Sequence, residues 1–379
     1  MPVAKWSPRN RARKGGKSMD ISLIICSRNR CQQLARCLES VRKIAFERTW
    51  QLIIVDNGST DETATVVRRL FENGDFQATY IFEPAAGRSR ALNTALRIAH
   101  GQILAFTDDD CYPAPDFLTQ IWAAFDEDPS VGYIGGRILL HDPTDIPITI
   151  NESTTPLTFP GRSFVCEGSV SGANMAFRRA VLLEVGGFDP LFGPGALFAA
   201  DDIDLVGRAS SAGWKGQYRP EVVVRHHHGR KIADFAPLMK DYLIGAGAYH
   251  MKFLLRGHEF LWFKRSIRDV YWQLLRVGEK RVFPQKELPE PIGVTPDITM
   301  RRLALWRLLG MLKYTYVYSE EAIRASIDRL KRLVCRSDRG RYAVDPTEHL
   351  RVVMDFAGPG SAPPDSSLRF EKTGDNATA

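Results

Sequence analysis

Between residues 21 and 106 the chain alternates short apolar segments with segments of helical periodicity, and this alternation strongly constrains its fold. Leu34, Leu38 and Val41 illustrate the helical spacing, and the apolar segments are 21–26, 52–55, 79–82 and 103–106. Strands that alternate with helices pair in parallel through right-handed crossovers and carry helices on both faces. We therefore expect an α/β domain with a mostly parallel sheet, extended by later strands at 131–140 and 222–224.

Polar side chains follow the predicted strands. Ser27 and Arg28 come directly after the first strand, Asp56 after the second, and Arg88 in the loop after the third. Ligands of such sheets bind beyond the carboxyl ends of the strands. These residues are therefore expected to share one site.

Three consecutive aspartates, Asp108, Asp109 and Asp110, follow the fourth strand. Adjacent carboxylates repel one another, so a folded protein normally supplies a cation, a basic partner or solvent exposure. An acidic loop or a helix cap is the simpler interpretation, because Asp favours both. The position of the triplet at the expected site edge favours a functional role.

Composition and charge narrow the class of protein. The chain of 379 residues has a net charge of +7, and residues 1–19 contain Lys and Arg but no acid, which predicts a disordered basic arm. We expect neither a signal peptide nor a membrane span, because no apolar run of about 18 residues occurs. A cytoplasmic location follows. The six cysteines show no Cys-x-x-Cys spacing, which argues against a zinc knuckle or a disulfide framework.

The C-terminal part differs in character from the strand-rich part. Segments 253–272 and 300–333 combine aromatic and basic residues at helical spacing. They are interpreted either as amphipathic helices on an anionic membrane surface or as a helical region packed on the first domain. The expected organisation is a basic arm, an α/β domain, a helical C-terminal region and a disordered tail, at 1–19, 20–230, 231–350 and 351–379.

With these residues in view, the chain resembles the family-2 glycosyltransferases, which have the Rossmann-like GT-A fold. The resemblance covers roughly residues 21–228. It rests on the order and spacing of short motifs: Ile-Cys-Ser-Arg-Asn-Arg at 25–30, Val-Asp-Asn-Gly-Ser-Thr-Asp at 55–61, Gly-Arg-Ser-Arg-Ala-Leu-Asn at 87–93, the aspartates at 108–110, Ser-Gly-Ala-Asn-Met-Ala-Phe-Arg-Arg at 171–179, Gly-Gly-Phe-Asp at 186–189 and Asp-Asp-Ile-Asp-Leu at 201–205.

The resemblance implies a nucleotide-diphosphate sugar bound across the strand ends and transferred with inversion. By this comparison Ser27 and Arg28 line the nucleotide, Asp56 hydrogen-bonds the base, and Arg88 meets the base or the diphosphate. One departure is Leu92, where many relatives have Arg, and Arg88 or Arg90 is the candidate to replace that charge.

The resemblance also implies a divalent metal, Mn²⁺ or Mg²⁺. Asp108 and Asp110 match the Asp-x-Asp pair, the first facing the ribose and the metal and the second ligating the metal. Asp109 is the variable middle position and is counted with the donor-binding residues, although adjacent acids form the pair in some relatives. His226 follows a strand where some relatives supply a third metal ligand, but the His tract at 226–228 can equally be a solvated turn.

The acceptor side is assigned to the second half of the matched region. Asp202 matches the general base of the family's Glu-Asp motif, where Asp201 replaces the usual Glu. Asn174 and Asp201 are the expected acceptor-binding residues, and the acceptor is a saccharide or a lipid-linked molecule at the inner membrane face.

Two other functions fit the sequence less well. A sugar nucleotidyltransferase would need a glycine-rich loop after the first strand, and residues 26–30 contain no Gly. A basic membrane- or nucleic-acid-binding module would use the basic arm and the C-terminal helices, but the expected cleft is acidic. We expect no specific nucleic-acid partner. The sequence leaves the donor sugar, the acceptor and the oligomeric state open.

Overall fold

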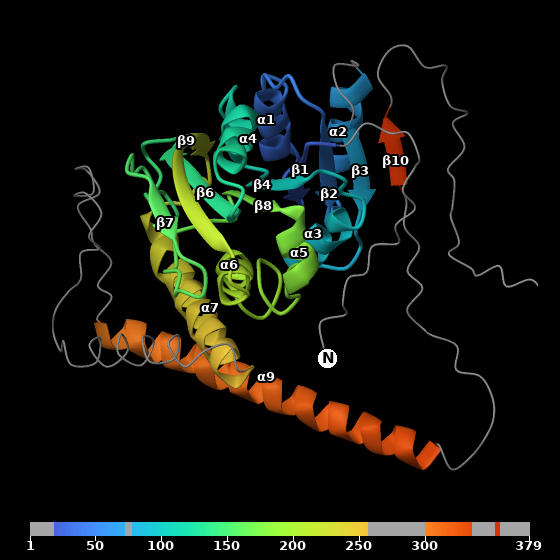
Figure 1. Cartoon of the computed structure of the whole chain (residues 1–379), viewed down its shortest axis with the longest axis vertical. Coiled ribbons are helices and arrows are strands. Elements are labelled where there is room, and N and C mark those ends of the chain that lie inside the picture. The colour runs from blue at the N-terminus through green and yellow to red at the C-terminus, as the bar shows by residue number, and fades with distance from the viewer. Residues whose placement is uncertain (1–18, 73–77, 257–299, 336–352, 357–379) are drawn as a thin grey trace, which may run out of the picture.

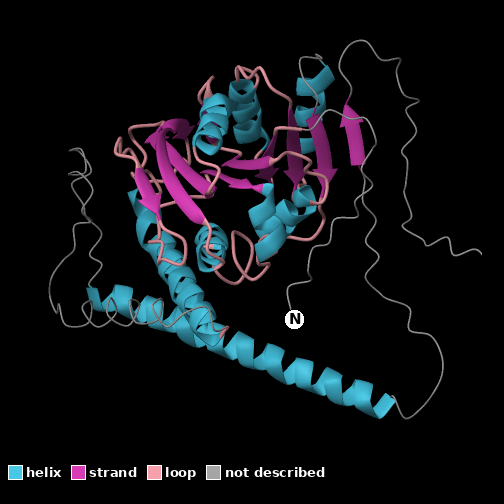
Figure 2. Cartoon of the chain, viewed as in Figure 1, coloured by secondary structure: helices cyan, strands magenta, loops and turns pink. Residues whose placement is uncertain are grey.

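The architecture is a mixed β-sheet between two layers of helices, with two long helices at one side (Figures 1 and 2). The computed structural model describes residues 19–72, 78–256, 300–335 and 353–356. Outside the described residues lie positions 1–18 of the expected basic arm at 1–19, most of the aromatic and basic segment at 253–272, and most of the tail.

The sheet has the strand order β10-β3-β2-β1-β4-β8-β6-β9-β5, and β7 pairs with β9 beside this path. The strand bounds are β1 (Ile21–Ser27), β2 (Trp50–Asp56), β3 (Ala78–Phe82), β4 (Ile103–Asp108), β5 (Cys111–Pro113), β6 (Val131–Leu140), β7 (Leu157–Phe159), β8 (Asn174–Arg178), β9 (Lys215–His226) and β10 (Val353–Phe356).

The parallel half of the sheet confirms the prediction from the strand and helix alternation. β1 pairs in parallel with β2 on one side and with β4 on the other. In this register Ser27 is opposite Asp56, and Cys26 is opposite Asp108. The polar residues that follow these strands therefore lie at one edge.

The other half of the sheet is more antiparallel than expected. β8 runs antiparallel to both β4 and β6, and β5 runs antiparallel to β9. The antiparallel β5–β9 pair places Cys111 opposite His226, and so brings the end of β9 beside the acidic triplet.

Helices cover both faces because their apolar sides match the two faces of the sheet. The helices are α1 (Cys31–Val41), α2 (Thr63–Glu72), α3 (Arg88–Leu96), α4 (Phe117–Glu127), α5 (Arg179–Val185) and α6 (Asp201–Ser211), followed by the short η1 (Ile232–Asp234). One hydrophobic core contains Leu34, Leu38 and Phe117 from α1 and α4, and the other contains Leu92 and Val206 from α3 and α6.

Two long helices follow the sheet: α7 (Phe235–Leu255) and α9 (Met300–Cys335). They cross closely at glycines, since a Cβ on Gly247 would lie 2.0 Å from the Arg307 carbonyl oxygen, and one on Gly310 would lie 2.0 Å from the Ile244 carbonyl oxygen. Tyr249 and Tyr314 from these helices belong to the core shared with α3 and α6. The described part of this C-terminal region therefore packs on the first domain, as one of the two interpretations of the sequence expected.

Among the described residues, no helix is both long and apolar enough to cross a bilayer. At the opposite end of the sheet, β10 pairs antiparallel with β3. The tail predicted from residue 351 therefore contains one strand, because the backbone at 353–356 pairs with the edge that β3 would otherwise leave open.

Candidate active site

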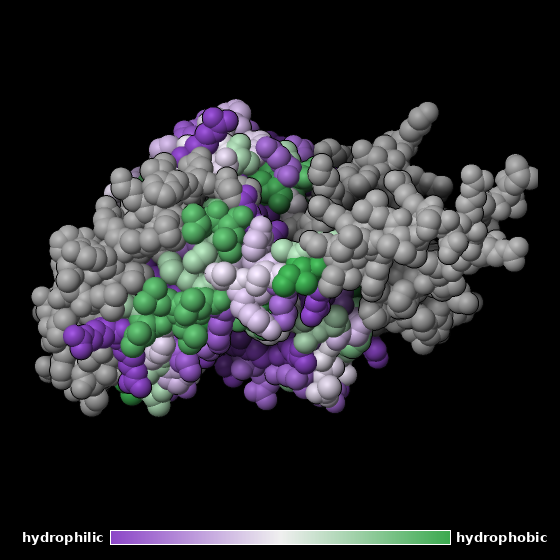
Figure 3. Space-filling model, turned by 90° about the horizontal axis from the view of Figure 1, so that it is seen from below, coloured by the Kyte–Doolittle hydropathy of each residue, from purple (hydrophilic) through white to green (hydrophobic). Residues whose placement is uncertain are grey.

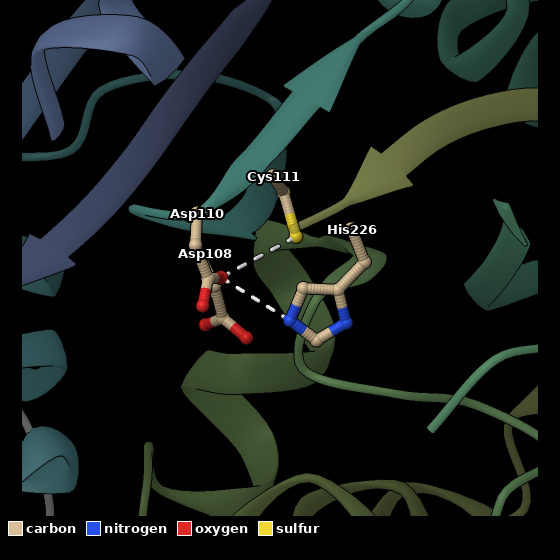
Figure 4. A group of neighbouring side chains, drawn as sticks. All are labelled: Asp108, Asp110, Cys111 and His226. Atoms are coloured by element: carbon tan, nitrogen blue, oxygen red, sulfur yellow. Dashed lines mark hydrogen bonds and ion pairs between the residues drawn. The ribbon is translucent and has the colours of Figure 1, made fainter. Parts of the chain in front are cut away.

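The acidic triplet lies where β4 ends and β5 begins, and its three carboxylates point in different directions. Asp109 and Asp110 are buried, and Asp108 is half-buried. The side chains of Asp108, Asp110, Cys111 and His226 offer donor atoms that all lie within 4.8 Å of one another (Figure 4). His226 Nε2 is 3.2 Å from an Asp110 oxygen. The structure thus brings together the three predicted metal ligands.

The donor set fits a hard divalent cation. Carboxylate oxygens suit Mg²⁺ and Mn²⁺, and an imidazole nitrogen is also common at transition-metal sites. Burial raises the pKa of the Cys111 thiol well above its usual range, so this sulfur stays protonated and is a poor ligand for such an ion. Asp108, Asp110 and His226 are the better set.

Arg30 contacts this group at Asp110 and also reaches Asp109. Its guanidinium lies 2.6 Å from an Asp110 oxygen and 3.3 Å from an Asp109 oxygen. Although burial opposes ionisation, the hydrogen bond and charge of His226, together with Arg30, lower the pKa of Asp110. Burial opposes a charge on His226 too, but Asp110 outweighs it and raises the pKa of the ring. Arg30 thus balances charge that a metal would otherwise balance.

Asp109 faces Ser27. The Ser27 hydroxyl donates a 2.7 Å hydrogen bond to Asp109, which joins the end of β1 to the triplet. Burial raises the pKa of Asp109 to about 7, above the value of an exposed carboxyl group. Asp109 therefore takes up a proton at a higher pH than Asp110, although the two residues are adjacent.

Arg88, at the start of α3, connects the two parts of the site. One of its Nη atoms lies 2.7 Å from an Asp108 oxygen and the other lies 2.6 Å from an Asp201 oxygen. It also donates to the Gly172 carbonyl oxygen at 3.2 Å. A single guanidinium therefore joins the acidic triplet to the start of α6.

Asp202 is held by backbone N–H groups beside this bridge. Gly172 and Ile203 donate hydrogen bonds of 2.9 and 2.7 Å to its two oxygens. Burial and the neighbouring charge of Asp201 raise the pKa of Asp202 to about 6. Such a value suits a residue that takes a proton near neutral pH.

The loop before α6 needs glycine for steric reasons. Gly193 has φ +104°, and a Cβ there would lie 2.9 Å from an Asp201 oxygen. Any other side chain would strain the backbone and press on the carboxylate that Arg88 binds.

Asp56 lies at the end of β2 on the same edge. It accepts a hydrogen bond from the Tyr80 hydroxyl at 2.6 Å and one from the Ser59 N–H at 2.8 Å. Arg28, predicted to line the nucleotide, is exposed. Within this turn, Arg30 and not Arg28 contacts the aspartates. The only sign of it in the sequence was its place as the second cation of the Ser-Arg-Asn-Arg turn.

Asn174 begins β8 and is buried. Its Nδ2 donates to the carbonyl oxygens of Arg137 and Val222 at 3.0 and 2.9 Å, so the amide links β8 to β6 and β9. Its Oδ1 has no hydrogen-bond partner among the described residues. The side chain therefore has a clear structural role.

A second acidic group lies beside the first. Asp142, Asp145 and His227 also place their donor atoms within 4.8 Å of one another. Lys231 Nζ is 2.6 Å from an Asp145 oxygen, and the Gly229 N–H donates to the other oxygen at 2.9 Å. The buried carboxylate is thus paired without a metal, and this group is a structural ion pair.

Comparison with known proteins gives a consistent result. Residues 22–184 match the family described as "Glycosyl transferase family 2". The chain is similar to the glycosyltransferase AglE of Haloferax volcanii, at 23% identity over 305 residues, which cover 80% of this chain and 85% of that protein. It is also similar to the pre-mycofactocin glycosyltransferase of Mycobacterium tuberculosis, at 26% identity over 233 residues, which cover 58% of this chain and 45% of that protein. The chain therefore spans about half the length of the mycobacterial relative.

Similar solved structures are more distant. The mannosyltransferase PcManGT from Pyrobaculum calidifontis, in complex with GDP-Man and Mn²⁺, is similar with a TM-score of 0.46 and 20% identity, covering 83% of this chain and 80% of that one. Staphylococcus aureus TarS 1–349 in complex with UDP-GlcNAc has a TM-score of 0.45 and 18% identity, covering 64% of this chain and 73% of that one.

Proposed function

We propose that the chain is a family-2 glycosyltransferase with the GT-A fold, and that it transfers a sugar with inversion and with the help of a divalent metal. The family match at residues 22–184 and the similarity to a glycosyltransferase over 80% of the chain support this proposal. The donor is a nucleotide-diphosphate sugar and the acceptor carries a hydroxyl group. One observation carries this proposal: Arg88 joins Asp108 of the metal-donor group to Asp201, the neighbour of Asp202.

The metal would be held by Asp108, Asp110 and His226. When bound, Mn²⁺ or Mg²⁺ offsets the charge that builds on the leaving diphosphate. Arg88, partly buried beside Asp108, adds a fixed positive charge at the same place. Ser27, Arg28, Asp56 and Asp109 complete the proposed donor-binding residues.

Asp202 is the proposed general base. Its carboxylate takes the proton of the acceptor hydroxyl as the oxygen attacks the anomeric carbon, and the diphosphate leaves from the opposite face. The N–H groups of Gly172 and Ile203 fix its orientation. Such a base is worth about 10²- to 10⁴-fold in rate.

Asp201 and Asn174 are the proposed acceptor-side residues. We propose a saccharide or lipid-linked acceptor and a cytoplasmic location, with peripheral contact at the inner membrane face. The two other functions, nucleotidyltransferase and binding module, are set aside because the family is one of glycosyltransferases.

Thermal unfolding in the presence of nucleotide sugars, with and without Mn²⁺, followed by product analysis with the active donor, tests the function. We expect one donor to raise the Tm only with the metal, and Asp110→Asn to abolish that shift. Asp142→Asn is the matched control, because it removes a carboxylate from the neighbouring group that Lys231 already balances. Equal shifts in both variants would contradict the metal assignment.

A further inference from the structure

The exposed side of α9 carries a stripe of large apolar side chains. We call Leu305, Leu309, Leu312, Tyr316 and Ile323 the α9 stripe. Four of them are strongly exposed: Leu305 at 59%, Leu312 at 68%, Tyr316 at 64% and Ile323 at 59%. Their sequence spacings of four, three, four and seven place all five on one face of the helix. Figure 3, which views the molecule from below, shows green apolar side chains gathered at the surface.

The stripe is separate from the face that holds α9 in place. Leu303, Met311 and Tyr314 are buried, and Gly310 meets α7 on that side. At about 100° per residue, these positions are centred opposite the stripe. The helix therefore has two apolar faces, and its packing on α7 accounts for only one of them.

Cations border the stripe. Arg301, Arg302, Lys313 and Arg324 are all exposed on the same helix. Two nearby acids are paired with cations: Glu320 lies 3.7 Å from Arg324, and Glu321 lies 3.4 Å from Arg256. Arg301, Arg302 and Lys313 therefore supply the positive charge of this border. An apolar face edged by cations is the pattern of a helix that lies in an anionic lipid interface.

The direction of the strands relates this face to the active site. In Figure 1 the arrowhead of β3 points toward the side of the molecule on which α9 lies. β2 runs parallel to β3, and β1 runs parallel to β2. The carboxyl ends of these strands, where the site residues lie, therefore face that side as well. A surface beneath α9 would thus be on the acceptor's side of the sheet.

We propose that the α9 stripe docks the protein on an anionic bilayer surface, from which it takes its acceptor. This deepens the proposed function by naming a lipid-anchored acceptor, and the docking itself does not depend on transfer. A second copy of the chain fits the face less well, because a twofold contact would oppose two cationic borders.

Co-sedimentation of the full chain with vesicles tests the proposal. The vesicles contain phosphatidylcholine alone or with about 30% phosphatidylglycerol, which supplies the negative surface charge. We expect sedimentation with the anionic vesicles, release at high salt, and a partition coefficient lowered about tenfold by the double change Leu305→Ser, Leu312→Ser. Wild-type protein that stays in the supernatant would overturn the proposal.

A matched control separates the stripe from general apolar exposure. Leu157 and Leu183 are exposed at 52% and 37% on β7 and α5, so the double change Leu157→Ser, Leu183→Ser alters the same chemistry elsewhere. We expect it to bind vesicles like the wild type; equal loss in both doubles would overturn the proposal. So would a dimer, seen by light scattering, that only the α9 double change dissociates.

The donor-induced Tm shift, measured without vesicles, keeps the two proposals distinct. A preserved shift without vesicle binding would remove the docking and leave the glycosyltransferase site. Vesicle binding without any donor-induced Tm shift would keep the docking and remove the glycosyltransferase site.

Discussion

At the scale of single residues, neighbouring carboxylates in this site differ because their surroundings differ. His226 and Arg30 lower the pKa of Asp110, which keeps it ionised. Asp109, one residue earlier, has a pKa raised by burial to about 7. Asp202 lies between these extremes at about 6. The triplet and Asp202 could be located from sequence, but these differences depend on contacts between residues far apart in the chain.

Asp202 predicts a pH profile. A base must be deprotonated, so kcat/KM should rise with pH through about 6 and then level off on that limb. Asp202→Asn should keep the donor-induced Tm shift and lose about 10²- to 10⁴-fold in kcat. Steady-state rates between pH 5 and 8 check this, and near-normal turnover of the variant would reject the role.

Arg30 predicts competition with the metal. Because its guanidinium lies on Asp109 and Asp110, Arg30→Gln should tighten Mn²⁺ binding to the free protein by roughly 3- to 10-fold, the size expected when a partly exposed ion pair is removed. Titration followed by electron paramagnetic resonance measures it directly. Arg28→Gln is the control, since Arg28 is exposed; weaker metal binding in Arg30→Gln would refute the idea.

At the scale of elements, the crossing of α7 and α9 depends on two glycines that leave no room for a side chain. Sequence periodicity predicted helices here. It did not predict that Gly247 of α7 lies against α9, or that Gly310 of α9 lies against α7. The edge pairing of β10 was missed for a related reason: strand partners separated by most of the chain leave no local signal.

We expect Gly310→Ala to destabilise the protein, although Ala has a higher helix propensity than Gly. Ala normally stabilises a helix by about 1 kcal/mol over Gly. Here its Cβ would lie 2.0 Å from the Ile244 carbonyl oxygen, so overpacking should lower the free energy of unfolding by about 1 to 3 kcal/mol. Urea unfolding measures the change, with Ser319→Ala on the exposed part of α9 as the control. A more stable Gly310→Ala would show that the helices are not held so closely.

At the scale of the whole molecule, the C-terminal helices are part of the core of the catalytic domain. The proposed division at residue 230 follows the chain, but Tyr249, Phe253 and Tyr314 pack in the core that also contains Phe192 and Val206. Lys252 adds an ionic link: it is buried, it pairs with Asp189 at 2.7 Å, and it pairs with Asp204 of α6.

Lys252→Met should be strongly destabilising. It leaves the buried Asp189 without its paired cation and Asp204 with Arg208 alone, and breaking a buried pair in this way typically costs about 3 to 5 kcal/mol. Although burial opposes ionisation, Lys252 lowers the pKa of Asp189, so this contribution is present at neutral pH and is lost as the pH falls through that lowered pKa. Denaturant unfolding at pH 7 and at acidic pH tests both points. Lys215→Met is the control, since its pair with Asp128 is partly exposed; equal losses in the two variants would argue against the link.

The bridge made by Arg88 also has a kinetic meaning. One guanidinium cannot hold Asp108 and Asp201 unchanged once the proposed cation and diphosphate are at Asp108, so filling the proposed donor site would change what Asp201 contacts. Donor binding at Asp108 is then coupled to the contacts of Asp201 on the proposed acceptor side. We expect the sugar donor to bind before the acceptor, with little loss of donor to water while the acceptor is absent, and product-inhibition patterns would reveal that order.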